Sequence, residues 1–505
     1  MFLTKCFARC SPLVFTVLLT SACTAAQAST EVPNQVQNST PNIVFIYTDD
    51  QAAWALGRNG ESQAITPNLD KLAAEGMYFP NAYANTPVCS PARASLLTSQ
   101  YGYELGIDDW INDNLKSKTL TGHQPDLGLD PKYETWPEVL ERSGYRTGLI
   151  GKWHLGELPK YHPTKHGYQE FVGFVEGGTS PENPVLEVEG KTTPHKGLTT
   201  DILTDYAIEF LGKHQGEKFA LSLHLRAPHY PFAPASPQDE APFKDMAIEV
   251  PHPDYPDLNI ERAHKLKREY LASVKGIDRN IGRLMDTLDE LNLRSNTLVI
   301  FTSDHGYTIG QNGIWHKGNG FWLLNKPPAG TDNVPRGQRP NLYDTTVKVP
   351  LIVRWPDAIE AGTVNPSTMS NLDWFPTLVS IANGKASDDN VIRGQDYLPA
   401  FLDKTKVLST DYYGAYTTQH QSLTQMRMYS DGAYKLVRDF KNPERNEFYD
   451  LKQDPLETTN LLKQALSKEQ RSILKAHDQI IHSKMRETND PVLTQYTAIE
   501  VRQGN

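Results

Sequence analysis

Cys89-Ser90-Pro91-Ala92-Arg93-Ala94-Ser95-Leu96-Leu97-Thr98-Ser99 places a cysteine directly before a run of residues typical of a helix. Ser90 is a favourable helix N-cap and Pro91 suits the first helical turn, so the stretch predicts a helix that begins just after Cys89. The N–H groups and the dipole of a helix N-terminus favour negative charge. Cys89 is therefore predicted to lie where a tetrahedral anion binds, with Arg93 one turn further and able to point back toward it.

The N-terminus predicts export. Two basic residues precede an apolar run at 12–22, which is too short to span a bilayer, and Ala26-Gln27-Ala28 is a small-x-small cleavage site. We predict a signal peptide over residues 1–28, a polar linker over 29–40, and a secreted or periplasmic protein. Leu19-Thr20-Ser21-Ala22-Cys23 also resembles a lipobox, so a lipoprotein anchored at Cys23 is the alternative.

Removal of this segment would leave Cys89 as the only cysteine, because Cys6, Cys10 and Cys23 all precede residue 28. A lone thiol in an oxidising compartment is either a small buried residue or a functional one. The 505-residue chain has a net charge of −10, which argues against nonspecific nucleic-acid binding. No later stretch is apolar and long enough to span a membrane.

Apolar strand-like runs alternate with helical segments over most of the chain, which predicts an α/β fold with a mostly parallel sheet between helices. The predicted strands are 42–48, 145–151, 218–225, 297–302 and 349–355, and the predicted helices include 66–76, 136–143, 198–214 and 260–291. The tail predicts short strands at 412–416, 426–430, 434–439 and 447–450, then a helix at 467–485. We therefore expect a catalytic domain over 41–400 and a small C-terminal domain, an antiparallel sheet with one helix, over 401–505.

Charged side chains follow the predicted strands at their carboxyl ends, where ligand sites form in open α/β sheets. Each alone is explained equally well as a surface or turn residue, but together they indicate one site. They are Asp49, Asp50, Lys152, His154, His229, Asp304 and His305.

Cys89-Ser90-Pro91-Ala92-Arg93 resembles the Cys-x-Pro-x-Arg signature of type I sulfatases, which depend on formylglycine and belong to the alkaline phosphatase superfamily. Gly151-Lys152-Trp153-His154-Leu155-Gly156 is similar to a second motif of that family, and Thr98-Ser99 departs from its usual Thr-Gly. The resemblance extends from Asn42 to about Leu461. It implies an alkaline-phosphatase-like fold, hydrolysis of sulfate esters, and oxidation of Cys89 to formylglycine (3-oxoalanine) by a formylglycine-generating enzyme.

The same resemblance implies a metal site made by the modified residue 89 with Asp49, Asp50, Asp304 and His305. Three carboxylates suit Ca²⁺, which prefers oxygen ligands. The nitrogen of His305 suits a transition metal better, so Mn²⁺ and Zn²⁺ are the alternatives to Ca²⁺.

The resemblance also implies a mechanism in which the hydrated formylglycine is the nucleophile. Arg93 stabilises its anion, and Lys152 and Lys317 hold the sulfate oxygens. His229 protonates the departing oxygen, and His154 helps the second hydroxyl expel sulfate.

The expected substrate is a sulfated carbohydrate, bound in part by Trp110, Trp315, His316 and Trp322. The export signal and the Gly-, Asn- and Pro-rich segment at 312–341 resemble those of sulfatases that act on marine algal polysaccharides such as carrageenan or ulvan. Two other functions fit the residues. One is a phosphonate or phosphate monoester hydrolase of the same superfamily, and the other is a non-catalytic protein that binds sulfated glycans.

Overall fold

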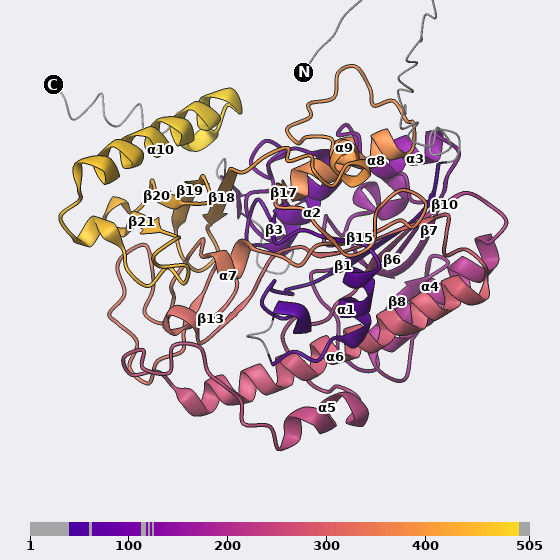
Figure 1. Cartoon of the computed structure of the whole chain (residues 1–505), viewed down its shortest axis with the longest axis horizontal. Helices are drawn as coiled ribbons and strands as arrows, with labels where there is room; N and C mark the ends of the chain where they lie inside the picture. The colour runs from indigo at the N-terminus through magenta and orange to yellow at the C-terminus, as the bar shows by residue number, and fades with distance from the viewer. Residues whose placement is uncertain (1–39, 60–62, 113–117, 120–121, 124–125, 494–505) are drawn as a thin grey trace, which may run out of the picture. The chain divides into compact units, whose positions relative to one another are not determined.

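The computed structural model describes residues 40–59, 63–112, 118–119, 122–123 and 126–493 (Figure 1). The predicted signal peptide, the alternative lipidated Cys23 and the linker up to residue 39 lie outside these residues. Among the described residues, none of the helices combines the length and the apolar character needed to cross a membrane.

A ten-stranded sheet forms the centre of the structure. In spatial order its strands are β16 (Thr363–Val364), β2 (Met77–Tyr78), β15 (Ile352–Arg354), β11 (Thr297–Ser303), β1 (Asn42–Thr48), β10 (Phe219–His224), β6 (Arg146–Lys152), β7 (Glu170–Phe174), β8 (Val185–Val188) and β9 (Lys191–Pro194). From β11 to β7 all neighbours are parallel. The strand predicted at 349–355 is present as β15, but it runs antiparallel to β11, as β8 does to β7.

Helices cover both faces of this sheet, as the alternation in the sequence predicts (Figure 1). On β1, Phe45 and Tyr47 point into one apolar cluster, while Val44 and Ile46 point into the other. The first cluster is closed by α2 (Cys89–Thr98), α3 (Trp136–Arg142), α8 (Trp374–Ile381) and α9 (Leu398–Leu402). The second is closed by α1 (Pro67–Ala74), α4 (Thr199–His214) and α6 (Ile260–Glu290).

The tail forms the predicted antiparallel sheet and helix. Its elements are β18 (Tyr412–Thr418), β19 (Thr424–Ser430), β20 (Tyr434–Asp439), β21 (Glu447–Asp450) and α10 (Lys468–Glu487). Ser467 caps α10, and Ile481 and Met485 pack on Leu436 and Phe448 of the sheet.

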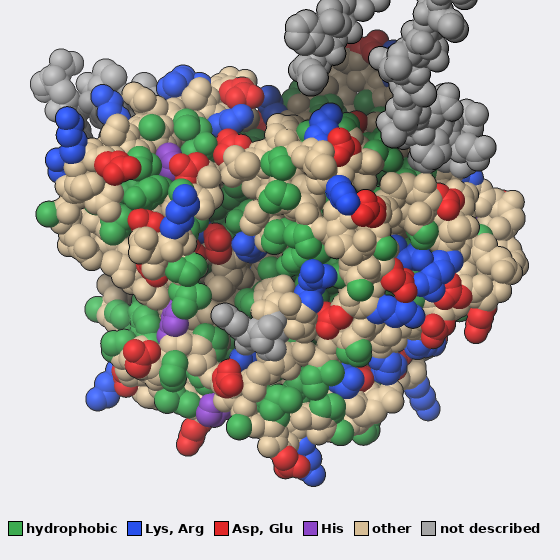
Figure 2. Space-filling view, viewed as in Figure 1, with side chains coloured by type: hydrophobic (Ala, Val, Ile, Leu, Met, Phe, Trp, Pro, Cys, Tyr) green, Lys and Arg blue, Asp and Glu red, His purple; other side chains and the backbone are tan. Residues whose placement is uncertain are grey.

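Short elements complete the described part of the chain. They are β3 (Asn81–Tyr83), β17 (Thr368–Ser370), β4 (Lys118–Thr119), β5 (Gly122–His123), β12 (Thr308–Ile309), β13 (Ile314–His316), β14 (Phe321–Trp322), α5 (Pro237–Lys244) and α7 (Asp344–Val347). The hairpin β13–β14 lies within the segment 312–341, so this predicted loop carries secondary structure. On the face shown in Figure 2, side chains of both charges are interspersed.

The start of α2 differs from the prediction. The helix begins at Cys89, with Val88 in the N-cap position and no side-chain cap, so the prediction of Ser90 as N-cap is wrong. The Ser90 hydroxyl instead accepts a hydrogen bond from the Ile111 N–H at 3.0 Å. A tertiary partner therefore uses the oxygen that a cap would need.

Candidate active site

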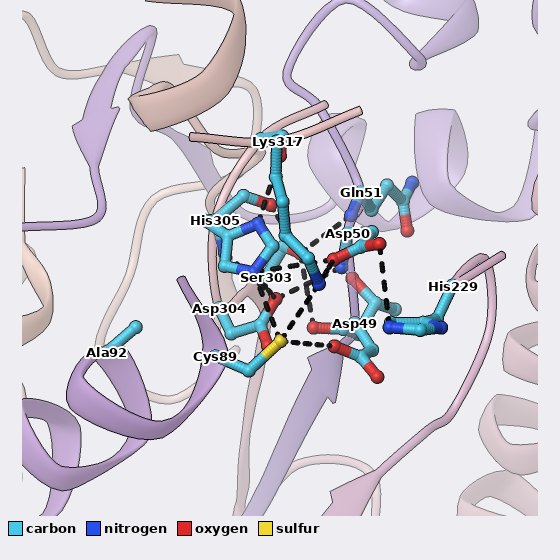
Figure 3. A network of polar contacts seen from close by, with 12 residues as sticks. Asp49, Asp50, Gln51, Cys89, Ala92, His229, Ser303, Asp304, His305 and Lys317 are labelled. Carbon is cyan, nitrogen blue, oxygen red and sulfur yellow. Dashed lines mark hydrogen bonds and ion pairs between the residues drawn. The ribbon is translucent and has the colours of Figure 1, made fainter. Parts of the chain in front are cut away.

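Parallel strands bring the predicted site residues to one edge of the sheet. Asp49 and Asp50 follow β1, Lys152 and His154 lie at the end of β6, His229 follows β10, and Asp304 and His305 follow β11. Cys89, in the first turn of α2, faces them, and Lys317 reaches in from the segment after β13 (Figure 3). The structure thus unites the residues that the sequence predicts for catalysis and metal binding.

The Cys89 sulfur lies at the centre of this group and is buried. The Lys317 ammonium donates to it at 3.0 Å, His305 Nε2 lies 3.4 Å away, and Asp49 Oδ1 lies 3.5 Å away. Burial alone would raise the pKa of the thiol, but Lys152 and Lys317 lower it to about 7. The position of the sulfur is therefore suited to negative charge.

Each of the three buried carboxylates has its own cation. Lys152 Nζ donates to Asp49 Oδ2 at 2.7 Å, Lys317 Nζ to Asp50 Oδ1 at 2.8 Å, and Arg93 Nη2 to Asp304 Oδ2 at 3.1 Å. Unpaired charges at this depth would be costly, so the pairing explains how the group stays buried. Arg93 thus contacts Asp304 rather than residue 89 itself.

The carboxylates and His305 form a fitting set of metal ligands. One ligand atom from each of Asp49, Cys89, Asp304 and His305 lies within 4.8 Å of the others, and a second such group contains Asp50 and His229. Asp50 Oδ2 is buried and has no hydrogen-bond partner among the described residues. A cation here would give this oxygen a partner, so the residues fit a divalent ion.

His229 is held by the loop after β10. Its Nδ1 donates to the Tyr230 carbonyl at 2.6 Å, which leaves Nε2 turned toward Asp50 Oδ2 at 4.0 Å (Figure 3). Arg226 stiffens this loop, because its guanidinium donates to the carbonyls of Pro231 at 2.8 Å and Thr179 at 3.1 Å. Burial lowers the pKa of His229 to about 3.

His154 lies two residues after Lys152, the last residue of β6. It has a positive φ of 62°, and its Nε2 lies 3.1 Å from the Ile111 carbonyl, so this nitrogen donates. Its Nδ1 is buried without a hydrogen-bond partner among the described residues. Burial lowers the pKa of His154, so the ring is neutral in the free enzyme.

The residues predicted to bind substrate fall into separate places. Trp315 and His316 are in contact on β13, with 5.4 Å between ring centroids, and they directly precede Lys317. Trp110 instead contacts His420 in a tilted arrangement, with 4.6 Å between ring centroids, beside the apolar cluster that contains Val88. Trp322 packs against a different apolar cluster, formed by Ile314, Tyr343 and Tyr449.

Sequence reasoning missed three residues at the site. Arg226 positions the His229 loop, and an arginine directly after the apolar run 218–225 is the signal that could have found it. The Ser303 hydroxyl accepts from the Gln51 N–H at 2.9 Å, which ties the ends of β1 and β11 together. The Gln51 amide is buried, and both of its polar atoms lack a partner among the described residues.

Residues 41–385 match the model of the sulfatase family, and residues 338–485 match that of the N-sulphoglucosamine sulphohydrolase C-terminal region. The chain is 26% identical to an N-acetylglucosamine-6-O-sulfatase of Bacteroides thetaiotaomicron, over 92% of this chain and 90% of the relative. It is 32% identical to an N-acetylgalactosamine-6-sulfatase of Mus musculus, over 76% and 71%. A solved structure of a protein with its substrate D-glucosamine-2-N,6-O-disulfate superposes with a TM-score of 0.72 at 25% identity, covering 90% of this chain and 99% of that one.

Proposed function

Since the chain belongs to the sulfatase family and is a sulfuric ester hydrolase, we propose that it removes sulfate from a sulfated glycan with a formylglycine made from Cys89. The observation that carries the proposal is the setting of the Cys89 sulfur, with Lys317, His305 and Asp49 all within 3.5 Å. A formylglycine oxygen would take the place of this sulfur. A formylglycine-generating enzyme would act on the chain before or during export to the periplasm or the exterior.

The proposed metal ligands are Asp49, Asp50, Asp304, His305 and the modified residue 89. Ca²⁺ is the proposed ion because most of these ligands are oxygens, and Mn²⁺ or Zn²⁺ is the alternative that His305 favours. When bound, the ion stabilises negative charge on the hydroxyl of residue 89. The orphaned Asp50 Oδ2 supports an ion at this position.

In the first step a hydroxyl oxygen of hydrated formylglycine 89 attacks the sulfur of the ester. A new O–S bond forms, the bond between sulfur and the sugar oxygen breaks, and Asp304 takes up the proton that the attacking hydroxyl loses. Arg93, whose guanidinium is fixed by Asp304 at 3.1 Å, contributes positive charge beside the nucleophile. Lys152 and Lys317 can turn from their carboxylates toward the sulfate oxygens and neutralise the charge that develops on them.

His229 is the proposed acid for the departing sugar oxygen, because its Nε2 faces the site while Nδ1 is held by the Tyr230 carbonyl. The free form of the enzyme holds this ring neutral, so the proton would have to be taken up together with the anionic substrate. In the second step the remaining hydroxyl of residue 89 loses its proton to His154 Nδ1. The C–O bond to sulfate breaks, the aldehyde re-forms, and water restores the hydrate.

The substrate class is proposed from two lines of support. The relatives named above include hexosamine-6-sulfatases, so glucosamine and galactosamine 6-sulfates are the first glycans to test. Carrageenan and ulvan, expected from the sequence, are the second group. Trp110, Trp315 and His316 remain proposed contacts to the sugar.

To test this, the chain is expressed together with a formylglycine-generating enzyme, and the mass of the peptide that carries residue 89 is measured. We expect the mass of the aldehyde or its hydrate, sulfate release from aryl and sugar sulfates, and far slower release of phosphate from the matched aryl phosphate. Cys89→Ser should abolish turnover when the modifying enzyme accepts only cysteine. Full activity of that variant, or a preference for the phosphate ester, would contradict the proposal.

A further inference from the structure

An aromatic pair begins at the residue directly after His229. Tyr230 follows His229 in the chain, and its ring meets that of Trp315 edge to face at 5.4 Å between centroids. The guanidinium of Arg262, in the first turn of α6, lies over the Trp315 ring at 4.7 Å. Segments from three parts of the chain thus place two rings and a cation in succession, starting from the residue after His229.

Both rings pack against further aromatic side chains, and that of Tyr230 is partly exposed. The Tyr230 ring packs against buried Phe232 at 5.4 Å, and Trp315 also contacts Phe321 at 5.8 Å. Tyr230 is nonetheless 43% exposed, although large apolar rings in this fold are mostly buried. A ring fixed on one side and exposed on the other can bind a partner at little further entropic cost.

The Arg262 guanidinium contacts the Trp315 ring but has no ion-pair partner among the described residues. Arg262 is exposed, and no carboxylate of the described residues lies within ion-pair distance of its guanidinium. Exposed arginines are common, but Arg262 is distinguished by its position over the Trp315 ring. Because the ring holds the guanidinium near one orientation, it is prepared for an anion such as a planar carboxylate or a tetrahedral sulfate.

We propose that Tyr230, Trp315 and Arg262 form a glycan subsite on the leaving-group side of the active site. The C–H face of the sugar next to the sulfated one packs on Tyr230 and Trp315, while Arg262 pairs with an anionic group on that same neighbouring sugar. This inference rests on the proposed function, in which His229 protonates the sugar oxygen. It adds a substrate class, namely an oligosaccharide with a carboxylate or second sulfate next to the sulfate that is removed.

Kinetics with a small and a large substrate test the aromatic part. Tyr230→Ala should lower kcat/KM at least about tenfold for a chondroitin 6-sulfate or ι-carrageenan tetrasaccharide, and change it less than about twofold for 4-nitrophenyl sulfate. Tyr230→Phe should restore the tetrasaccharide rate, because it keeps the ring. Equal losses on both substrates, or no loss on either, would overturn the subsite.

A matched pair of glycans tests the cation. Arg262→Gln should raise KM several-fold for the chondroitin 6-sulfate tetrasaccharide, and leave the KM of its carboxyl-reduced form unchanged. Lys265→Gln, on an exposed position of the same helix, is the charge-matched control and should alter neither. If Arg262→Gln and Lys265→Gln behave alike, the assignment of Arg262 is wrong.

Binding separates a failure of the subsite from a failure of the proposed reaction. In the Cys89→Ala protein, calorimetry should show binding of at least one of the two tetrasaccharides, weakened about tenfold by Tyr230→Ala. That result would support the subsite even if the wild-type chain releases no sulfate. Binding that Tyr230→Ala leaves intact, or no binding of either tetrasaccharide, would overturn it even if aryl sulfate is hydrolysed.

Discussion

Replacement of Lys317 by methionine tests whether the cations at the site stand in for a divalent ion. The Lys317 ammonium donates to Asp50 Oδ1 at 2.8 Å, its side chain is 9% exposed and that of Asp50 is 0% exposed. Removing one partner of a buried ion pair leaves an uncompensated charge, which typically costs about 3–5 kcal/mol. His305 Nε2 remains 3.3 Å from Asp50 Oδ1, so we expect the lower end, about 3 kcal/mol.

A divalent ion should reverse most of this loss. An ion at 100 times its Kd stabilises the folded state by about 2.7 kcal/mol, and Lys317 no longer competes for Asp50 in the variant. Ca²⁺ should therefore stabilise Lys317→Met more than it stabilises the wild type. The measurement is urea unfolding of protein with unmodified Cys89, with EDTA and with Ca²⁺, read from the midpoints at a shared slope.

Lys435→Met is the matched control. Lys435 is fully buried and pairs with Asp344 at 2.8 Å and Glu457 at 2.7 Å, remote in sequence from the proposed metal ligands. Its replacement should destabilise the chain similarly, with no gain in the response to Ca²⁺ over the wild type. The reasoning is refuted if Lys317→Met loses less than about 0.5 kcal/mol, or if Ca²⁺ stabilises both variants equally.

Three further predictions follow from buried polar groups. Arg226→Gln removes the guanidinium bonds of the His229 loop and should lower kcat for 4-nitrophenyl sulfate about tenfold, with Arg226→Lys closer to the wild type; an unchanged kcat would contradict this positioning role. Burial lowers the pKa of His166 to about 4. Below the pKa of the unfolded chain, near 6.5, the unfolded chain takes up a proton that the folded chain does not, so stability falls as the pH is lowered. Urea midpoints should show a loss of about 2 kcal/mol between pH 7 and pH 5 that His166→Gln removes, and a parallel loss in that variant would assign the effect elsewhere. Arg427→Met leaves the fully buried Asp490 unpaired and should cost about 3–5 kcal/mol in urea unfolding, whereas the double variant with Asp490→Leu should recover most of it; a double variant no more stable than the single one would contradict this account.

The sequence alone was sufficient for the parts of the fold that repeat a local pattern. The run from Asn42 to Thr48 predicts a buried parallel strand because its apolar side chains point to both faces of the sheet, and β1 has these bounds. The rule that sites form at the carboxyl ends of parallel strands also predicted that Asp49, His229 and Asp304 would lie close together. The direction of β15 did not follow, because an apolar run has the same composition in parallel and antiparallel pairing.

Local signals failed where a distant partner competes for the same atom. Ser90 is a good N-cap by type, but its hydroxyl accepts from the Ile111 N–H, so the helix starts without it. For Arg226 there was no local signal of its partners, since these are carbonyls whose approach depends on the folded loop. Neither outcome is encoded within a helical turn of the residue concerned.

The same distinction explains why the chemical centre was predictable, whereas Tyr230 and Arg262 of the proposed subsite were not. The centre is built at the ends of strands that pair directly, so its geometry is inherited from the hydrogen bonds of the sheet. Tyr230, Trp315 and Arg262 come from a loop, a hairpin and a helix, and only their packing brings them together. Changes there would alter which glycan fits without disturbing the strands that hold the nucleophile, so specificity and chemistry can vary separately in this chain.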